Sequence, residues 1–355
     1  MELQGKPDFE VAMKRIDAWF AHEMIDRPPV RFSAHNFSFT DDHPLAKRTW
    51  PDLQTRWFDA EFQVDLFAEY IREATFYGET FPVFYPNLGP NVYAAFHGAE
   101  LEFGNVTSWI KHCVHEQADV KRLKFSRDNV YFQKIEELTR VALQKCAGKF
   151  IVGYTDLHGS LDSAADWRDP QELCFDTVDC PGLVHALVDL ANENFLPVFD
   201  HYDAVLKAHS QVSVTWLGIP ARGKLHIPSC DFTNMVSPKV FEEFYLPSLL
   251  REARHMTHNI FHVDGKGMIR HLDYILAVPE IQAIQWVQGV GDDLPILQWL
   301  PLIKRIQAAG KSVVVDLQLA ELEPFIAEMN PRGLYLCIRA PHDVQPDILK
   351  RLARW

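Results

Sequence analysis

The fold is decided by the stretch Asn259-Ile260-Phe261-His262-Val263-Asp264-Gly265, in which an apolar run rich in β-forming residues ends in a His-x-Asp pair and a glycine. In an extended strand, residues two apart point to the same face, so His262 and Asp264 project together from the strand's C-terminal end. An imidazole beside a carboxylate can bind a metal ion or work as an acid–base pair. The alternative, a histidine merely satisfied by a neighbouring aspartate, stays open on spacing alone.

Similar short apolar segments recur along the chain and alternate with helical patterns. Strands are predicted at 29–33, 81–85, 150–154, 212–216, 259–263, 281–286, 311–316 and 333–338. Helices are predicted at 136–143, 180–208 (one long helix or a broken pair), 238–254, 268–277, 297–308, 320–329 and 344–353. Such alternation implies a parallel sheet with right-handed crossovers. Eight strands in this order predict an α/β fold, the (β/α)8 or TIM barrel, whose chemistry lies at the C-terminal strand ends.

The chain is predicted to form one domain over residues 1–355, because it contains no linker, repeat or low-complexity run. A helix near 8–24 precedes the first strand, so residues 1–28 are expected to form a helical cap at the bottom of the barrel. Long insertions at 87–130 and 160–210 interrupt the first half, whereas the units of the second half are compact.

The composition is that of an acidic globular protein, with a net charge of −13 and a pI near 5.6. This charge disfavours nucleic acid and anionic membranes as partners. The six cysteines include no CxxC pair, which is typical of reduced thiols and predicts a cytoplasmic protein. We expect no signal peptide after Met1 and no bilayer-spanning segment, because the chain lacks the apolar runs that each requires.

A small-molecule pocket is expected where the strands end, because these ends meet at one face of a barrel. The residues that follow the strands there are candidates for substrate binding: His35, Asn36, Tyr85, Asp156, His158, Trp216 and Arg339. A single histidine of this kind, such as His158, is more often a hydrogen-bonding loop residue than a ligand, so the prediction depends on the whole set.

Two cysteines and an aspartate extend the His262 and Asp264 pair into a candidate metal site. Cys337 lies near the end of the eighth predicted strand, which faces the fifth across a barrel, so the three side chains are expected to meet. Nitrogen, oxygen and sulfur ligands that leave a position open suit a catalytic zinc. The alternative is that Cys337 is a buried small residue, which is the commonest fate of a cysteine.

The segment 224–238 follows the fourth predicted strand and is long enough to fold over the pocket as a lid. Its Cys230 is a candidate fourth metal ligand, and its Asp231 is a candidate ligand or acid–base group beside His262 and Asp264. The alternative is a structured loop in which Asp231 caps local backbone amides.

The same regions carry a resemblance to a known superfamily. Its motifs are matched by Asp231-Phe232, by Ser237-Pro238-Lys239-Val240-Phe241-Glu242-Glu243-Phe244 with Pro247, and by Phe261-His262-Val263-Asp264-Gly265. Cys337-Ile338-Arg339-Ala340-Pro341 and Gly98-Ala99-Glu100-Leu101-Glu102-Phe103 are similar to its closing segment and to an early hairpin. Over residues 225–355 the chain resembles the uroporphyrinogen decarboxylase superfamily, which includes cobalamin-dependent and coenzyme M methyltransferases. The resemblance implies a barrel of the uroporphyrinogen decarboxylase and methionine synthase type, and a homodimer.

Within that superfamily the chain is more similar to the methyltransferase branch. True decarboxylases carry an arginine-rich loop after the first strand, but the segment 29–38 here lacks the arginine pair. The methyltransferases carry a zinc motif of the form H-x-C with a second cysteine near the eighth strand. His262 and Cys337 match that motif, and Asp264 stands in place of its first cysteine. The resemblance therefore implies a zinc-dependent methyl transfer between a small substrate and a corrinoid, which a partner protein would carry because the chain has no cobalamin-binding motif.

Three other functions remain open. Tetrapyrrole decarboxylation would need arginines at one rim, where Arg31, Arg222, Arg270 and Arg339 are the candidates. A metal-free enzyme would use His262 and Asp264 as its acid–base pair. A non-catalytic barrel that binds a small ligand would need neither a metal nor the arginines.

Overall fold

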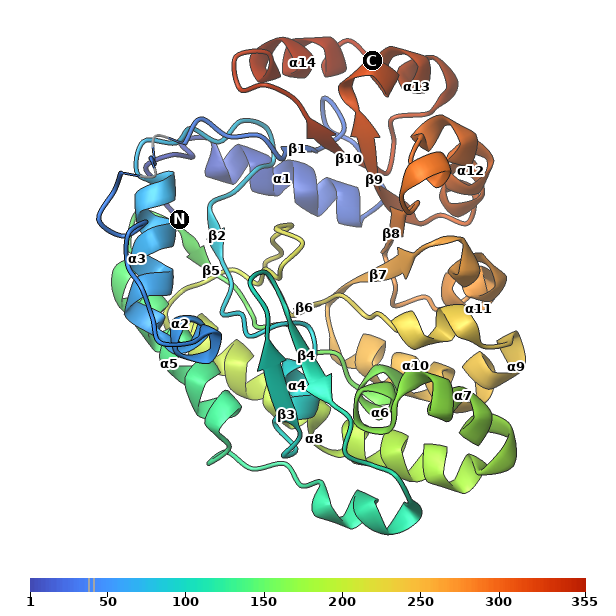
Figure 1. Cartoon of the computed structure of the whole chain (residues 1–355). Helices are drawn as coiled ribbons and strands as arrows, with labels where there is room; N and C mark the ends of the chain where they lie inside the picture. Colours follow the sequence, from blue (N-terminus) through green and yellow to red (C-terminus); the bar gives the residue numbers. More distant parts are fainter. Residues whose placement is uncertain (38, 41) are drawn as a thin grey trace.

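The computed structural model describes residues 1–37, 39–40 and 42–355. Its centre is a curled, six-stranded parallel sheet with the strand order β1-β10-β9-β8-β7-β6 (Figure 1). These strands are β1 (Val30–Phe32), β10 (Leu334–Arg339), β9 (Ser312–Gln318), β8 (Ala283–Val287), β7 (His258–Asp264) and β6 (Leu225–His226). A separate parallel pair, β2 (Val83–Phe84) and β5 (Ile151–Val152), lies on the remaining side. The predicted α/β class with parallel strands is confirmed, whereas a closed eight-stranded barrel is not what the described residues form.

Between the two sheets, the segments beside the strands share single backbone hydrogen bonds rather than ladders. The Glu79 N–H donates to the Val30 carbonyl oxygen (2.7 Å) on one side, and the Tyr154 N–H donates to the Val214 carbonyl oxygen (2.9 Å) on the other. The close approach of this second pair requires Gly153, because a Cβ there would lie 2.6 Å from the Val214 oxygen.

The prediction of a strand at 212–216 is wrong, and a local turn is the reason. The chain reverses at residues 216–218, where Gly218 has a φ of 71°, and Ser213 then pairs with Ala221 in an isolated antiparallel bridge. The parallel neighbour of β7 is instead the two-residue strand β6, which lies inside the segment expected to be a lid. That segment therefore begins as part of the sheet.

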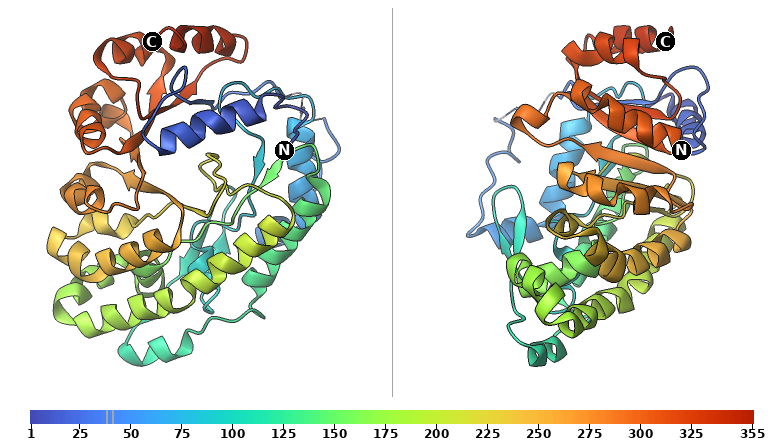
Figure 2. Two further views of the ribbon diagram at one scale, coloured as in Figure 1. Left: turned by 180° about the vertical axis from the view of Figure 1, so that it is seen from behind. Right: turned by 90° about the vertical axis from the view of Figure 1, so that its right-hand side faces the viewer.

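The strands alternate between two environments. On the outer face, side chains such as Phe261 and Val263 pack against helices. On the inner face, a second apolar cluster includes Ile260, Ala283, Val314 and Tyr335. The predicted N-terminal helix, α1 (Phe9–Phe20), belongs to that inner cluster and lies across the N-terminal ends of the strands (Figure 2). Its Trp19 indole donates to the carbonyl oxygen of Gly333 (3.0 Å), just before β10. The inner face is therefore sealed by α1 at one end.

The outer layer consists of helices that follow the strands. They are α2 (Leu53–Phe58), α3 (Ala60–Ile71), α5 (Val130–Lys145), α10 (Leu246–His255), α11 (Leu272–Leu276), α12 (Leu300–Ala308), α13 (Leu322–Glu328) and α14 (Gln345–Leu352). The predicted helix 238–254 is interrupted: α9 (Pro238–Val240) is followed by a π-helical turn at Phe241–Tyr245 before α10. Pro247 explains the turn, because it has no N–H to donate to the carbonyl four residues earlier.

The two long insertions fold into defined elements on one side of the molecule (Figure 1). The first contains α4 (Val92–Ala95) and the antiparallel hairpin of β3 (Glu100–Phe103) and β4 (Ser108–Lys111), which agrees with the hairpin that the resemblance implied. The second contains α6 (Ser160–Arg168), α7 (Pro170–Asp179) and α8 (Pro181–Ala208). The helix α8 is continuous although Pro197 lies inside it. Within the described ranges, no helix is both long and apolar enough to cross a membrane.

Candidate functional site

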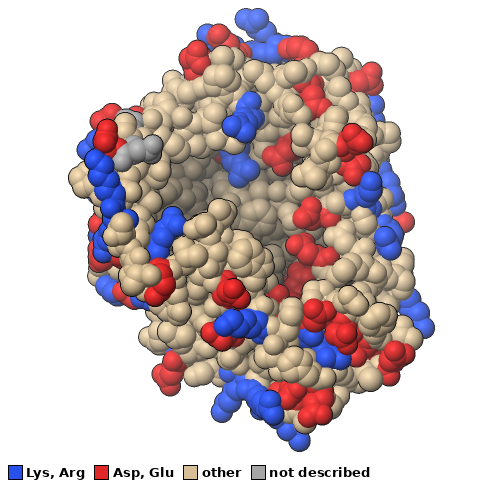
Figure 3. All heavy atoms as spheres, viewed as in Figure 1, with Lys and Arg blue, Asp and Glu red and all other residues tan. Residues whose placement is uncertain are grey.

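Strand β7 places His262 and Asp264 on the inner face of the sheet, as its alternation predicts. His262 lies two residues beyond the buried Ile260, and its Nε2 is 4.0 Å from Asp264 Oδ2. The side chain of His262 is 12% exposed and that of Asp264 is 45% exposed, so the pair lies between the core and solvent. Figure 3 shows that the same face of the molecule is hollowed at its centre, with acidic residues gathered along one side of the hollow.

The orientation of His262 is fixed by the neighbouring strand. Gln285 of β8 pairs with His262 in register, and its Oε1 lies 2.8 Å from His262 Nδ1. An amide oxygen can only accept a hydrogen bond, so Nδ1 carries a proton, and Nε2 is the ring nitrogen that could offer a lone pair to a metal. The Trp216 ring meets the imidazole edge-on at 5.4 Å between centroids. His262 is therefore held with Nε2 directed toward its carboxylate neighbours.

Asp231 completes a group of three possible metal ligands. One ligand atom from each of Asp231, His262 and Asp264 lies within 4.8 Å of the others. Burial raises the pKa of the Asp264 carboxyl, the His262 ring opposes this, and the nearby Asp231 carboxylate adds to it. Two carboxylates and a free imidazole nitrogen suit a divalent cation, which would also relieve the repulsion between the acids. We call these three residues the acidic cluster.

Cys337 also lies on the inner face of the sheet, but its neighbours are not those of the acidic cluster. Strand register sets it beside Arg31 of β1 and Asp316 of β9. Burial raises the pKa of the Cys337 thiol to about 12, although Arg31 acts in the opposite direction. The thiol therefore lies outside the acidic cluster and is protonated at neutral pH. Its role as a metal ligand stays a prediction.

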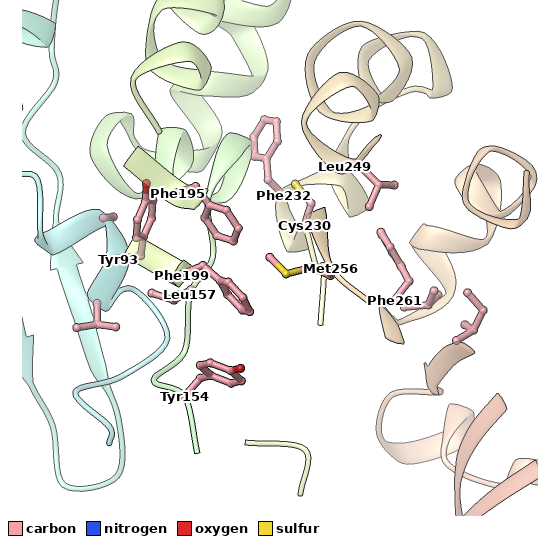
Figure 4. Close-up of a cluster of buried hydrophobic side chains, with 14 of the residues drawn as sticks. Tyr93, Tyr154, Leu157, Phe195, Phe199, Cys230, Phe232, Leu249, Met256 and Phe261 are labelled. Atoms are coloured by element: carbon pink, nitrogen blue, oxygen red, sulfur yellow. The ribbon is translucent and has the colours of Figure 1, made fainter. Parts of the chain in front are cut away.

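Cys230 precedes the acidic cluster in sequence but points into the core. Figure 4 shows its side chain in a buried hydrophobic cluster with Phe232, Leu249 and Met256. Burial raises the pKa of the Cys230 thiol well above its usual range, and the carboxylates of Asp162 and Asp231 add to the effect. Its predicted role as a fourth ligand is likewise untested, and the structure places it outside the acidic cluster.

With this geometry established, the chain can be compared with known proteins. No protein-family description matches the sequence, and no curated protein matches it. Its fold is that of a methyltransferase from Methanosarcina mazei. The two structures superpose with a TM-score of 0.58 at 14% sequence identity, over 96% of this chain and 98% of the other. At this identity the similarity extends to the fold and leaves the reaction to be argued from the site.

Beside the acidic cluster lies a second group of titratable residues, to which the predicted residues Asp156 and His158 belong. His158 Nε2 is 2.9 Å from Asp156 Oδ1, and its Nδ1 is 3.8 Å from Asp162 Oδ2. Burial disfavours the imidazolium, but the carboxylates of Asp156, Asp162 and Asp231 outweigh it and raise the pKa of His158 to about 10. His158 is therefore a cation at neutral pH, so its predicted role in substrate binding would involve a charged ring.

A pocket of about 270 Å³ opens next to this group, between α6 and the loop that carries Asp231. It is lined by His158, Asp162, Asp166, Asp231 and Asn91, among others. Burial raises the pKa of Asp166 well above its usual range, and the neighbouring Asp162 contributes to the shift. Sequence reasoning missed Asp162 and Asp166 because they follow the strand by several residues and lie within a helix.

The other predicted substrate-binding residues are dispersed. His35 lies between the rings of Phe37 and Phe76, at 4.9 and 5.5 Å between centroids. Asn36 is exposed and caps the Thr75 N–H, while Arg339 is exposed at the end of β10. Burial raises the pKa of Tyr85 to about 12, and Tyr85 lines a separate pocket of about 180 Å³. Of the predicted substrate-binding set, Trp216 is the residue that contacts His262.

Proposed function

We propose that this chain is an enzyme that moves a methyl group between a small-molecule substrate and a corrinoid held by a partner protein, with a zinc ion bound by Asp231, His262 and Asp264. The observation that carries the proposal is the acidic cluster, whose three donor atoms lie within 4.8 Å of one another. The methyltransferase fold and the superfamily resemblance support the class of reaction. The same proposal treats the chain as one domain and its curled sheet as a variant of the superfamily's barrel.

The residues present fit a divalent cation. His262 offers Nε2 because Gln285 engages Nδ1, and an outer-shell partner of this kind normally orients a metal-binding histidine. The partial exposure of Asp264 leaves the cluster accessible from the hollow, so a position remains for a substrate atom. A bound zinc supplies Lewis acidity, which lowers the pKa of a coordinated thiol or alcohol and favours the nucleophilic anion.

The side chains around the cluster would act on the substrate directly. Trp216 meets the His262 ring edge-on and presents an apolar surface beside it, which suits the methyl-bearing part of a small molecule. Asp231 is exposed and the side chain of Asp264 is 45% exposed, so a group carried by another protein would have access to the cluster.

Tetrapyrrole decarboxylation is a weaker candidate because the arginines do not converge. Arg222 pairs with Glu10 (2.8 Å) and Asp17 (3.5 Å) of α1, at the opposite end of the strands from His262. Arg270 is exposed and bonds the carbonyl oxygen of Gly267. Arg31 is engaged by Cys337 and by the carbonyl oxygen of Leu217.

The first test is metal content, measured by mass spectrometry on protein purified without chelator. We expect about one zinc per chain, and its loss in His262→Ala, because one ligand of three is removed. His258→Ala is the matched control, since His258 lies on the same strand but packs against Phe20 at the other end. Cys337→Ala distinguishes the acidic cluster from a site that includes the Cys337 thiol. Retention of zinc in this variant supports the acidic cluster, and loss of zinc indicates that the thiol is a ligand.

The second test is methyl transfer from methylcobalamin to a small thiol, followed by the change in corrinoid absorbance. We expect turnover by the zinc-loaded protein and none by His262→Ala. Zinc absent from the wild-type protein, or unaffected by His262→Ala, would overturn the metal site and leave His262 and Asp264 as an acid–base or structural pair.

A further inference from the structure

Asp162 of α6 makes an unusual set of contacts with the loop that carries Asp231. Its Oδ2 accepts a hydrogen bond from the Asp231 N–H (3.1 Å), and its Oδ1 accepts one from the Phe232 N–H (3.0 Å). One side chain, remote in sequence, thus binds the backbone of two consecutive residues of the loop.

These contacts supply what the loop lacks locally. Residues Asp231–Met235 form a 3₁₀ turn, and its N-cap residue, Cys230, makes no side-chain hydrogen bond to the turn. The first N–H groups of a helical turn have no partner within it and need an acceptor from elsewhere. Asp162 provides both acceptors, so the position of the first residue of the turn, Asp231, depends on it.

The carboxylate is placed there at an electrostatic cost. Burial raises the pKa of Asp162, and the nearby Asp231 carboxylate raises it further. His158 lies 3.8 Å from Asp162 and is itself paired with Asp156, so a charged chain leads from the end of β5 to the loop. An apolar residue would avoid this cost, but it could not hold the two backbone amides.

We propose that Asp162 is a positioning residue for metal binding, which holds the loop so that the Asp231 carboxylate faces His262 and Asp264. This inference rests on the proposed function, because it assumes that the acidic cluster binds a divalent cation. Asp162 would act through Asp231 and would not bind the metal itself. The three ligands come from a strand and a loop, and the loop is the part that needs a second anchor.

The test is the zinc affinity of Asp162→Asn, measured by competition with a chromophoric chelator. The amide keeps the shape of the side chain but retains one acceptor oxygen of two, so one loop amide loses its partner. We expect affinity to fall about 10–100-fold, the usual cost of removing an outer-shell partner. Asp166→Asn is the matched control: Asp166 lies one turn further along α6 and lines the same pocket, but accepts from Asn91 Nδ2 (2.6 Å) instead. We expect its affinity to match that of the wild type.

A double-mutant cycle separates positioning from a general loss of stability. If Asp162 acts through Asp231, then Asp162→Asn should weaken zinc binding in the wild-type background and have little further effect in Asp231→Ala. Equal effects in both backgrounds, or wild-type affinity in Asp162→Asn, would overturn the inference. Failure of the wild-type protein itself to bind zinc would instead overturn the proposed function.

A second measurement decides the matter if Asp162→Asn does not fold. Hydrogen exchange of the Asp231 and Phe232 amides in metal-free wild-type protein reports whether the loop is held before the metal arrives. Slow exchange at both amides supports a preformed anchor. Exchange at the rate of an unprotected amide would contradict it.

Discussion

On the inner face of the sheet, β7 and the loop after β6 bring an imidazole and two carboxylates within 4.8 Å of one another. On the same face, β1, β9 and β10 bring together a guanidinium, a carboxylate and a thiol from Arg31, Asp316 and Cys337. The acidic cluster combines like charges that repel one another, and its histidine has a free nitrogen. In the Arg31 group the cation is already supplied by the protein.

This difference in charge explains why an aspartate of the acidic cluster is better suited to bind a metal than Asp316 is. A carboxylate or thiol that faces an arginine has its charge compensated, so an added cation gains little there. The acidic cluster contains no lysine or arginine, and the repulsion between its two carboxylates favours the binding of a cation. Burial raises the pKa of both Asp316 and Asp264. Arg31 opposes the shift at Asp316, whereas at Asp264 the His262 ring opposes it and the Asp231 carboxylate adds to it.

The largest expected effect concerns the reactivity of the Cys337 thiol. With a pKa of about 12, it carries so little thiolate at pH 8 that alkylation should be on the order of 1,000-fold slower than for a free cysteine. The exposed Cys180 is the internal control and should react at an ordinary rate. The measurement is maleimide labelling of folded protein, quantified per cysteine by peptide mass spectrometry. If Cys337 is labelled as fast as Cys180, its thiol is not protected by its surroundings, and Cys337 would again be a candidate metal ligand.

The next effect concerns the orientation of His262. Gln285→Leu removes the acceptor for His262 Nδ1 while keeping the side-chain volume similar, so either ring nitrogen can carry the proton. We expect zinc affinity to fall about 10–100-fold, as for other outer-shell partners. The measurement is competition with a chromophoric chelator.

Gln288→Leu is the matched control for this change, because Gln288 is also buried but donates to the carbonyl oxygens of Leu294 and Asp316. Its zinc affinity should stay near that of the wild type. If the two variants bind zinc equally well, Gln285 does not set the histidine tautomer.

Much of the fold was predictable because its strands are short apolar runs that alternate with helical patterns. Seven of the eight predicted strands lie within one or two residues of observed ones. The prediction at 212–216 is wrong because a turn at Gly218 reverses the chain, and β6 has two residues, too few to show a pattern. Closure of the barrel could not be predicted from a strand count, because it depends on ladders between segments that here share single hydrogen bonds.

The candidate site was predictable only where its residues share a strand. The alternation of β7 was enough to pair His262 with Asp264, and the same rule places Gln285, Asp316 and Cys337 two residues beyond inward-facing apolar residues of their own strands. A buried polar residue in an apolar strand, such as Gln285, was an available signal that we did not use. The partner of each residue depends on strand register and on remote loops, so neither the Arg31 group nor the contacts of Asp162 could be inferred from sequence.

The smallest expected effect is on the free energy of unfolding, and it tests whether the charge of Asp264 is compensated as that of Asp316 is. The raised pKa of Asp264 means that the folded protein binds its proton more tightly than the unfolded chain does, so the charged form destabilises the folded state. Without metal at pH 7, Asp264→Asn should therefore be more stable than wild type by at most about 1 kcal/mol, a modest figure because the side chain is 45% exposed and screened by water.

This difference should shrink as the pH falls through the raised pKa of Asp264 and vanish below the carboxyl's ordinary pKa of 3.8, where the group is neutral in both the folded and the unfolded protein. Saturating zinc should reverse the order, since a ligand at 100 times its Kd stabilises the protein by about 2.7 kcal/mol and the variant lacks one metal ligand. Thermal unfolding, followed at several pH values and with and without zinc, measures both the pH dependence and the effect of the metal. Asp292→Asn, at an exposed turn, is the control. A variant that is less stable than wild type in the absence of metal would show that Asp264 is stabilised by its surroundings. The charge of the acidic cluster would then already be compensated, as in the Arg31 group, and the electrostatic argument that the cluster binds a cation would fail.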